Sequence, residues 1–123
     1  MAERTKIAVV DDDESVRESL PDLLASFGFE ASPFASAEDF LASGTIGDVD
    51  CLILDVAMPG MSGPELQREL GRMGHATPIV FITAHSDEKV WPALLGSGAV
   101  ACLLKPFSED AMLGAVWRAL NRG

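Results

Sequence analysis

Apolar residues gather in short continuous runs along the chain, and each run has the length of a buried strand. These runs predict strands near residues 6–10, 51–54, 79–82 and 100–104, and a weaker run predicts a strand near residues 30–34. Between the runs, apolar positions recur with helical spacing, so helices and strands alternate along the chain. Glycines mark the expected helix ends, at Gly28, Gly44, Gly74 and Gly98.

Serine and acidic residues mark the expected helix starts. Three pairs have the capping-box spacing, namely Ser15 with Glu18, Ser36 with Asp39 and Ser62 with Glu65. Residues 86–88 and 108–110 each place acids in the first turn of a further helix. Two prolines disturb this pattern. Pro21 falls inside the first helix and predicts a kink there, and Pro92 falls early in the fourth helix and predicts a short or loose one.

The alternation of strands and helices predicts an α/β fold. Parallel strands need crossover connections, and right-handed crossovers place helices on both faces of the sheet. We therefore expect a three-layer sandwich with a parallel sheet of five strands in the middle. No repeat, low-complexity tract or long linker interrupts the pattern, so residues 1–123 are expected to form a single domain.

Composition limits the classes of function. The 123 residues are 48% hydrophobic, which is enough for a compact core, and no apolar stretch approaches the roughly 20 residues of a membrane helix. We expect a cytoplasmic protein with no membrane association. The 19 acidic and 9 basic residues give a net charge of −10, which argues against direct binding to nucleic acid. Cys51 and Cys102 lie in apolar runs and are expected to be core or near-core thiols, outside any zinc or redox motif.

Charged residues gather where the predicted strands end. Asp11-Asp12-Asp13 follows the first run and Asp55 closes the third, so these carboxylates should meet at one edge of a parallel sheet. Like charges about 4 Å apart repel by roughly 4 kcal/mol per pair at an effective dielectric near 20. The sequence therefore predicts a hard cation at this edge. Thr83 follows the fourth strand, and Lys105 follows the fifth.

This order of residues resembles the receiver domain of two-component response regulators, in the CheY-like superfamily. That family has an acidic pair after the first strand, an aspartate after the third, Thr or Ser after the fourth, and Lys-Pro after the fifth. All of these elements are present, and the segments 55–63 and 98–107 are most similar to receivers of the FixJ type. The resemblance covers essentially the whole chain. It implies a flavodoxin-like (βα)5 fold with strand order 2-1-3-4-5.

The resemblance also implies a function for the acidic cluster. Asp55 would be the phosphoacceptor, and the phosphoryl group would come from a sensor histidine kinase or a phosphotransfer protein. The cofactor would be Mg²⁺, bound directly by Asp12 and through water by Asp11, with Asp55 and the main-chain carbonyl of Ala57 as further ligands. The phosphoryl group would be contacted by the Thr83 hydroxyl, the Ala84 N–H and the Lys105 ammonium.

The role of other residues near this site stays open. Asp13 reads as a loop acid at the entrance to the first helix, although it could still tune metal affinity. Lys105-Pro106 could carry a cis peptide bond, which the sequence alone does not decide. His85 could influence the lifetime of the acyl phosphate or merely fill its loop, and His75 is expected to be solvated.

The chain departs from the family pattern at Cys102. Receivers usually have Tyr or Phe three residues before the lysine, and rotation of that ring accompanies movement of the threonine. We hypothesise that phosphorylation instead shifts the fourth helix, where Trp91 and Pro92 lie. The last helix, near residues 108–121, has apolar residues on two stripes, Leu113, Val116, Trp117 and Leu120 on one and Met112, Ala115 and Ala119 on the other. One stripe must pack on the sheet, and the surplus is either a partner or dimer face, which the fourth and fifth helices often provide in this family, or further core.

Three alternatives compete with a phosphorylated switch. A phosphatase of the haloacid dehalogenase type also uses a strand-end aspartate and Mg²⁺, but its second aspartate would stand where this chain has Ala57. A flavodoxin needs a phosphate-binding loop after the first strand, and Asp11 to Asp13 would repel a phosphate. The third alternative is a receiver-like interaction module that is never phosphorylated. The intact acidic site argues against this module, and Cys102 leaves it open.

Overall fold

We analysed a computed structural model of the chain, which describes residues 4–84 and 91–121. The described residues form a five-stranded parallel sheet with the strand order β2-β1-β3-β4-β5. This confirms the predicted α/β class and the order that the family resemblance implies. The strands match their predicted positions to within one residue: β1 Lys6–Val10, β2 Glu30–Phe34, β3 Cys51–Asp55, β4 Ile79–Thr83 and β5 Ala101–Leu104.

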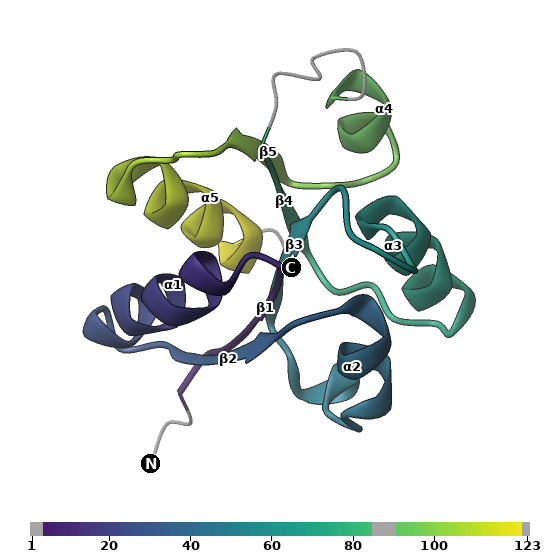
Figure 1. Ribbon diagram of the computed structural model, residues 1–123, viewed down its shortest axis with the longest axis horizontal. Helices are drawn as coiled ribbons and strands as arrows, with labels where there is room; N and C mark the ends of the chain where they lie inside the picture. The colour runs from purple at the N-terminus through teal and green to yellow at the C-terminus, as the bar shows by residue number, and fades with distance from the viewer. Residues whose placement is uncertain (1–3, 85–90, 122–123) are drawn as a thin grey trace.

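Helices follow the strands in alternation and cover both faces of the sheet (Figure 1). Helices α1 and α5 lie on one face, and α2, α3 and α4 lie on the other. A short 3-10 helix at residues 46–48 connects α2 to β3. The α-helical bounds are α1 Glu14–Ser26, α2 Ala37–Ala42, α3 Gly63–Arg72, α4 Trp91–Gly96 and α5 Glu109–Asn121.

The two faces of the sheet bury two separate hydrophobic clusters. Successive strand side chains point to opposite faces, so Ile7 and Val9 pack beneath α1 and α5 while Ala8 and Val10 pack beneath α2 and α3. Every residue of β3 and β4 is buried, because these central strands are covered on both sides. That double coverage is why their sequences are continuously apolar up to the polar residue that ends each strand.

Four of the helix starts can be compared with their predicted caps. The Ser36 side chain accepts the Asp39 N–H, and Ser62 and Glu65 form a reciprocal capping box at the start of α3. Ser108 accepts the Ala111 N–H at 3.0 Å before α5. The predicted cap at Ser15 is wrong. Asp13 is the N-cap of α1, and its carboxylate accepts the N–H and the hydroxyl of Ser15 instead.

The lengths of α1 and α4 and the burial of α5 can be compared with the remaining helix predictions. Helix α1 continues through Pro21 to Ser26, and α4 is short, as its proline suggested. The residues expected to start the fourth helix, 86–88, lie outside the described residues. In α5 the fully buried residues are Met112, Ala115, Val116 and Ala119, so the stripe of Met112, Ala115 and Ala119 faces the sheet together with Val116 from the other stripe. Trp117, from the other stripe, is 50% exposed and packs its ring edge-to-face on Phe29.

The cysteine prediction is also borne out. Cys51 is buried and Cys102 is half-buried, and both are free thiols. Burial raises the pKa of the Cys51 thiol to about 12. Among the helices described, none is both long enough and apolar enough to cross a membrane.

Candidate functional site

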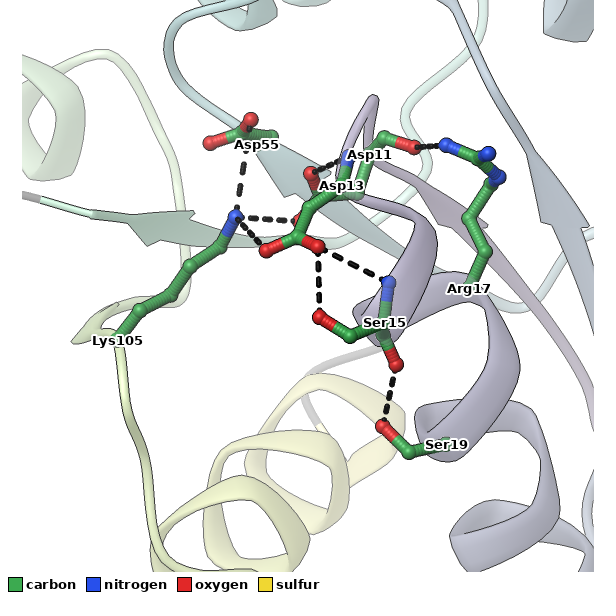
Figure 2. Close-up of polar contacts among 7 residues, drawn as sticks. All are labelled: Asp11, Asp13, Ser15, Arg17, Ser19, Asp55 and Lys105. Carbon is green, nitrogen blue, oxygen red and sulfur yellow. Dashed lines mark hydrogen bonds and ion pairs between the residues drawn. The ribbon is translucent and has the colours of Figure 1, made fainter.

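The polar strand ends predicted to converge do lie together at the carboxyl edge of the sheet. Asp11 directly follows β1, Asp55 ends β3, Thr83 ends β4 and Lys105 directly follows β5. Three of these side chains, those of Asp11, Asp55 and Thr83, are the buried polar residues within the described part of the chain. Figure 2 shows the Lys105 side chain reaching from the β5 end toward both aspartates. Buried charge of this kind needs partners, because removing an ion from water is costly.

Three carboxylates come close enough to share one cation. Asp11, Asp12 and Asp55 each have an oxygen within 4.8 Å of the others, with Asp12 at the exposed side of the group. Lys105 Nζ lies 2.7 Å from Asp11 Oδ2 and 3.8 Å from Asp55 Oδ2. One ammonium therefore faces a group of three acids, and the group keeps an excess of negative charge.

That excess changes the proton affinity of the central carboxyl. Burial, together with the negative charge of Asp11, raises the pKa of Asp55 from 3.8 to about 8, although Lys105 acts in the opposite direction. Burial alone would lower the pKa of Lys105, but its hydrogen bond and attraction to Asp11 outweigh burial and raise it. Lys105 therefore stays charged, while Asp55 is easily protonated in the absence of a cation.

The turn after β1 is held by its own side chains and by α1. The Asp13 N–H donates to Asp11 Oδ1 at 2.8 Å, and the Arg17 guanidinium donates to the main-chain carbonyl of Asp11 at 3.0 Å (Figure 2). Hydrogen bonds from Ser15 to the Asp13 carboxylate lower the pKa of Asp13. Asp13 Oδ2 also lies 3.9 Å from Lys105 Nζ, so this acid belongs to the site as well as to the helix cap.

The loop between β3 and α3 closes tightly against Asp55. Gly63 N–H donates to the Val56 carbonyl at 3.0 Å, and a Cβ built on Gly63 would lie 2.3 Å from the main-chain oxygen of Asp55. Glycine is therefore required by the close approach of the two backbones. Ala57 is exposed in this loop, two residues beyond Asp55.

The donor atoms suit a hard divalent cation. Asp11 Oδ2 is a buried side-chain oxygen whose close polar partner is the Lys105 ammonium, at 2.7 Å. Carboxylate oxygens from three residues are the ligand type that Mg²⁺ prefers, and Mg²⁺ binds proteins through few carboxylates while it keeps several waters. The residues therefore fit the Mg²⁺ that the family resemblance implies.

The structure describes the other predicted site residues except His85. Ala84 and Lys105 line a cavity of about 420 Å³, together with Asp13, Ser15 and Phe107. The Lys105-Pro106 peptide bond, which the sequence left open, is cis. Cys102 pairs in register with Phe81 and is packed in the cluster beneath α2, α3 and α4. Trp91 begins α4, and His85 lies outside the described residues.

Sequence reasoning missed two residues of the site's framework. No local signal in the sequence marks Arg17, because its guanidinium donates to a main-chain carbonyl in the preceding loop. Asp13 was assigned to the loop, although an aspartate directly before Glu14 is also a good N-cap signal. The capping-box spacing of Ser15 with Glu18 outweighed that signal in the sequence.

Comparisons with known proteins give a consistent result. A family model described as "Response regulator receiver domain" matches residues 7–117. Response regulator protein TodT of Pseudomonas putida is 40% identical over 122 residues, which cover 98% of this chain and 54% of TodT. Transcriptional regulatory protein FixJ of Azorhizobium caulinodans is 39% identical over 122 residues, which cover 99% of this chain and 58% of that protein. The solved structure of response regulator StyR has a TM-score of 0.89 and 45% identity, and the match covers 97% of this chain and 60% of that one. The chain thus spans little more than half the length of these relatives.

Proposed function

The chain belongs to the response regulator receiver domain family of two-component systems, and on this premise we propose that it is a switch phosphorylated on Asp55. Receiver domains of this family interact with histidine kinases, so the donor is a sensor histidine kinase or a phosphotransfer protein. One observation carries the proposal. The carboxylates of Asp11, Asp12 and Asp55 converge within 4.8 Å, with the Lys105 ammonium beside them.

In the proposed reaction the Asp55 carboxylate is the nucleophile. One oxygen forms a bond to the phosphorus of a phosphohistidine while the P–N bond breaks. The imidazole nitrogen keeps the electron pair of that bond, and the product on Asp55 is an acyl phosphate. The attack requires Asp55 to be ionised, which its pKa of about 8 opposes at neutral pH.

Mg²⁺ would be held by Asp11, Asp12, Asp55 and the main-chain carbonyl of Ala57. When bound, it supplies positive charge that favours the ionised carboxylate and offsets the repulsion between an anionic nucleophile and an anionic donor. Support for this ligand set comes from the three convergent carboxylates, two of which, those of Asp11 and Asp55, are buried. Ala57 rests on the family resemblance alone.

Three further groups would contact the phosphoryl oxygens. Lys105 is the point charge, because its ammonium lies 3.8 Å from the Asp55 carboxylate and its raised pKa keeps it protonated. The Thr83 hydroxyl and the Ala84 N–H would donate hydrogen bonds from the end of β4. On this proposal the chain catalyses only its own phosphorylation and dephosphorylation and turns over no metabolite.

The output would be altered binding to a partner protein. We propose that this response passes through α4 and α5, whose surfaces could also form a homodimer, with Cys102 replacing the aromatic ring usual in the family. His85 and Trp91 belong to the same proposed switch region. No direct contact of this chain with nucleic acid is proposed, given its net charge of −10.

The test is the intact mass of the protein after incubation with acetyl phosphate. We expect a gain of one phosphoryl group that requires Mg²⁺ and disappears in Asp55→Asn. The Asp39→Asn variant is the matched control, because it removes an exposed acid that lies outside the group of Asp11, Asp12 and Asp55. An unmodified mass under every condition, with no Mg²⁺ binding, would refute the proposal and favour an interaction module that is never phosphorylated.

A further inference from the structure

One side chain from α2 reaches across to the loop that follows Asp55. Glu38 lies in the first turn of α2, and its Oε2 accepts the main-chain N–H of Met61 at 2.9 Å. The two residues are 23 positions apart, so this is a tertiary contact between two separate elements. Glu38 belongs neither to the motif of the family nor to a capping pair of the sequence.

The same carboxylate shapes the backbone next to Met61. Gly60 has a φ of +75°, and a Cβ built on it would lie 2.5 Å from Glu38 Oε2. Gly60 therefore allows both the left-handed backbone and the close approach of the carboxylate. Glu38 rests directly against Gly60 and binds the next residue along the chain.

This contact adds a polar anchor near the far end of a loop that is also held at other points. The loop begins at Asp55, and Gly63 N–H bonds the Val56 carbonyl at its base. At its far end the capping box of Ser62 and Glu65 starts α3. Between these two anchors, Met58 is buried in the core cluster beneath α2 and α3, whereas Ala57 and Pro59 are exposed. Glu38 adds a polar contact to this loop at Met61. The helix that carries Glu38 is itself well anchored, because Phe40 is fully buried and packs edge-to-face on Phe34.

We propose that Glu38 is a positioning residue that holds the β3–α3 loop in place and thereby sets the affinity of the acidic site for a divalent cation. This inference rests on the proposed function, because the loop is taken to present the Ala57 carbonyl to Mg²⁺. Residues that orient metal ligands without touching the metal typically change its affinity by about tenfold to a hundredfold. Glu38 is exposed and makes one bond, so we expect the lower part of that effect.

The experiment compares three variants in the whole chain. Glu38→Ala removes the acceptor, and alanine suits a helix. Glu38→Gln removes the charge but keeps an oxygen that can accept the Met61 N–H. Asp39→Ala removes the neighbouring exposed acid, whose side chain makes no hydrogen bond or ion pair with the loop in the described part of the chain. It therefore reports the effect of lost charge alone.

Two quantities are measured for each variant. The first is the exchange rate of the Met61 amide hydrogen without metal, which we expect to rise at least about fivefold in Glu38→Ala only. The second is the dissociation constant for Mg²⁺ from calorimetric titration, expected to rise about three- to tenfold in Glu38→Ala. Glu38→Gln and Asp39→Ala should agree with each other within about twofold.

The outcomes separate this inference from the proposed function. If the wild type binds Mg²⁺ and Glu38→Ala binds it as Asp39→Ala does, the positioning role is refuted while the proposed function stands. Equal weakening in Glu38→Ala and Glu38→Gln would also refute it, because charge rather than the hydrogen bond would then be responsible. If the wild type binds no Mg²⁺, both proposals fall, and the Met61 exchange rate decides only whether Glu38 holds the loop.

Discussion

The charge on Asp55 should make the stability of this protein depend strongly on pH. In the folded state burial and Asp11 raise the pKa of Asp55 to about 8, whereas the ordinary value is 3.8. The folded protein therefore binds this proton more tightly than the unfolded chain does. The stabilisation from that proton is complete below about pH 4 and is lost as the pH rises toward 8.

The size of the effect follows from the number of protons bound. Between about pH 5 and 7.5 the folded state holds nearly one proton more than the unfolded state, so each pH unit lowers the free energy of unfolding by about 1.4 kcal/mol. Over that range the loss is as much as about 3 kcal/mol, which is a large fraction of the 5–15 kcal/mol typical of a small domain. The lowered pKa of Asp13 and the raised pKa of Lys105 act outside this window, below about pH 4 and above about pH 10.

Urea unfolding in a buffer that contains a chelator measures this dependence directly. The unfolding of wild type and Asp55→Asn would be followed by far-ultraviolet circular dichroism at several pH values and constant ionic strength. Asp55→Asn keeps every other titrating group, so the difference between the two profiles isolates Asp55. We expect the wild type to lose stability from pH 5 to 7.5, and the variant to lose much less and to be the more stable protein at pH 7.5.

Two results would refute this reasoning. A wild-type free energy of unfolding that is flat between pH 5 and 7.5 would mean that Asp55 is ionised throughout, with a pKa close to its ordinary value. The same slope in wild type and Asp55→Asn would assign the pH dependence to other groups. In either case the negative charge of the buried carboxylates would be neutralised more completely than their distances to the Lys105 ammonium indicate.

Three further predictions concern the site and its supports. Removing Mg²⁺ at pH 7.5, from a concentration a hundredfold above its dissociation constant, should lower the free energy of unfolding by about 2.7 kcal/mol. The same urea titration should show a smaller loss for Asp55→Asn. Gly63→Ala should destabilise the protein by about 2 kcal/mol or more, because its Cβ would meet the Asp55 carbonyl, whereas Gly71→Ala in the same helix meets nothing within 4 Å and should be neutral or stabilising. Ser62→Ala should lower the free energy of unfolding by about 1 kcal/mol through loss of the capping box, and equal stability of the variant and wild type would contradict this.

The fold was predictable because its strongest signals are local. In β3 and β4, burial on both faces produces continuous apolar runs, and each run ends where a polar residue reaches the edge of the sheet. The apolar run of β2 was the weakest, because β2 is an edge strand that pairs with β1 alone and its residues are exposed or only partly buried. The start of β5 was placed one residue early, at Val100, because an apolar residue before a strand looks like the strand itself.

The start of the first helix shows where local signals fail. Asp13 and Ser15 are both good capping residues, and the sequence favoured Ser15 because Glu18 follows at the right distance. The structure selects Asp13, whose second oxygen lies 3.9 Å from the Lys105 ammonium. The bonds of this cap, from the Ser15 N–H and hydroxyl to Asp13, are local, so the sequence offered two local signals and the capping-box spacing favoured the wrong one.

The centre of the site was predictable for a topological reason, and its supports were not. Parallel strands end at the same edge, so Asp11, Asp55 and Lys105 had to meet once the strands were assigned. Arg17 and Glu38 instead act through long side chains from helix surfaces, and they bind main-chain groups of the Asp11 turn and of Met61. Any exposed arginine or glutamate has the same local signature, so only the packing of the helices identifies these two.

The electrostatics of the site link its stability to its proposed chemistry. When all groups are ionised, the carboxylates of Asp11, Asp12, Asp13 and Asp55 outnumber the single Lys105 ammonium, so the site carries an excess of negative charge that a divalent cation would reduce. Without that cation, the simplest way to reduce the repulsion is to protonate Asp55, which agrees with its raised pKa. Protonation also removes the nucleophile. On the proposed function, the burial that costs the folded protein stability at neutral pH would therefore also make the reactivity of Asp55 depend on the metal.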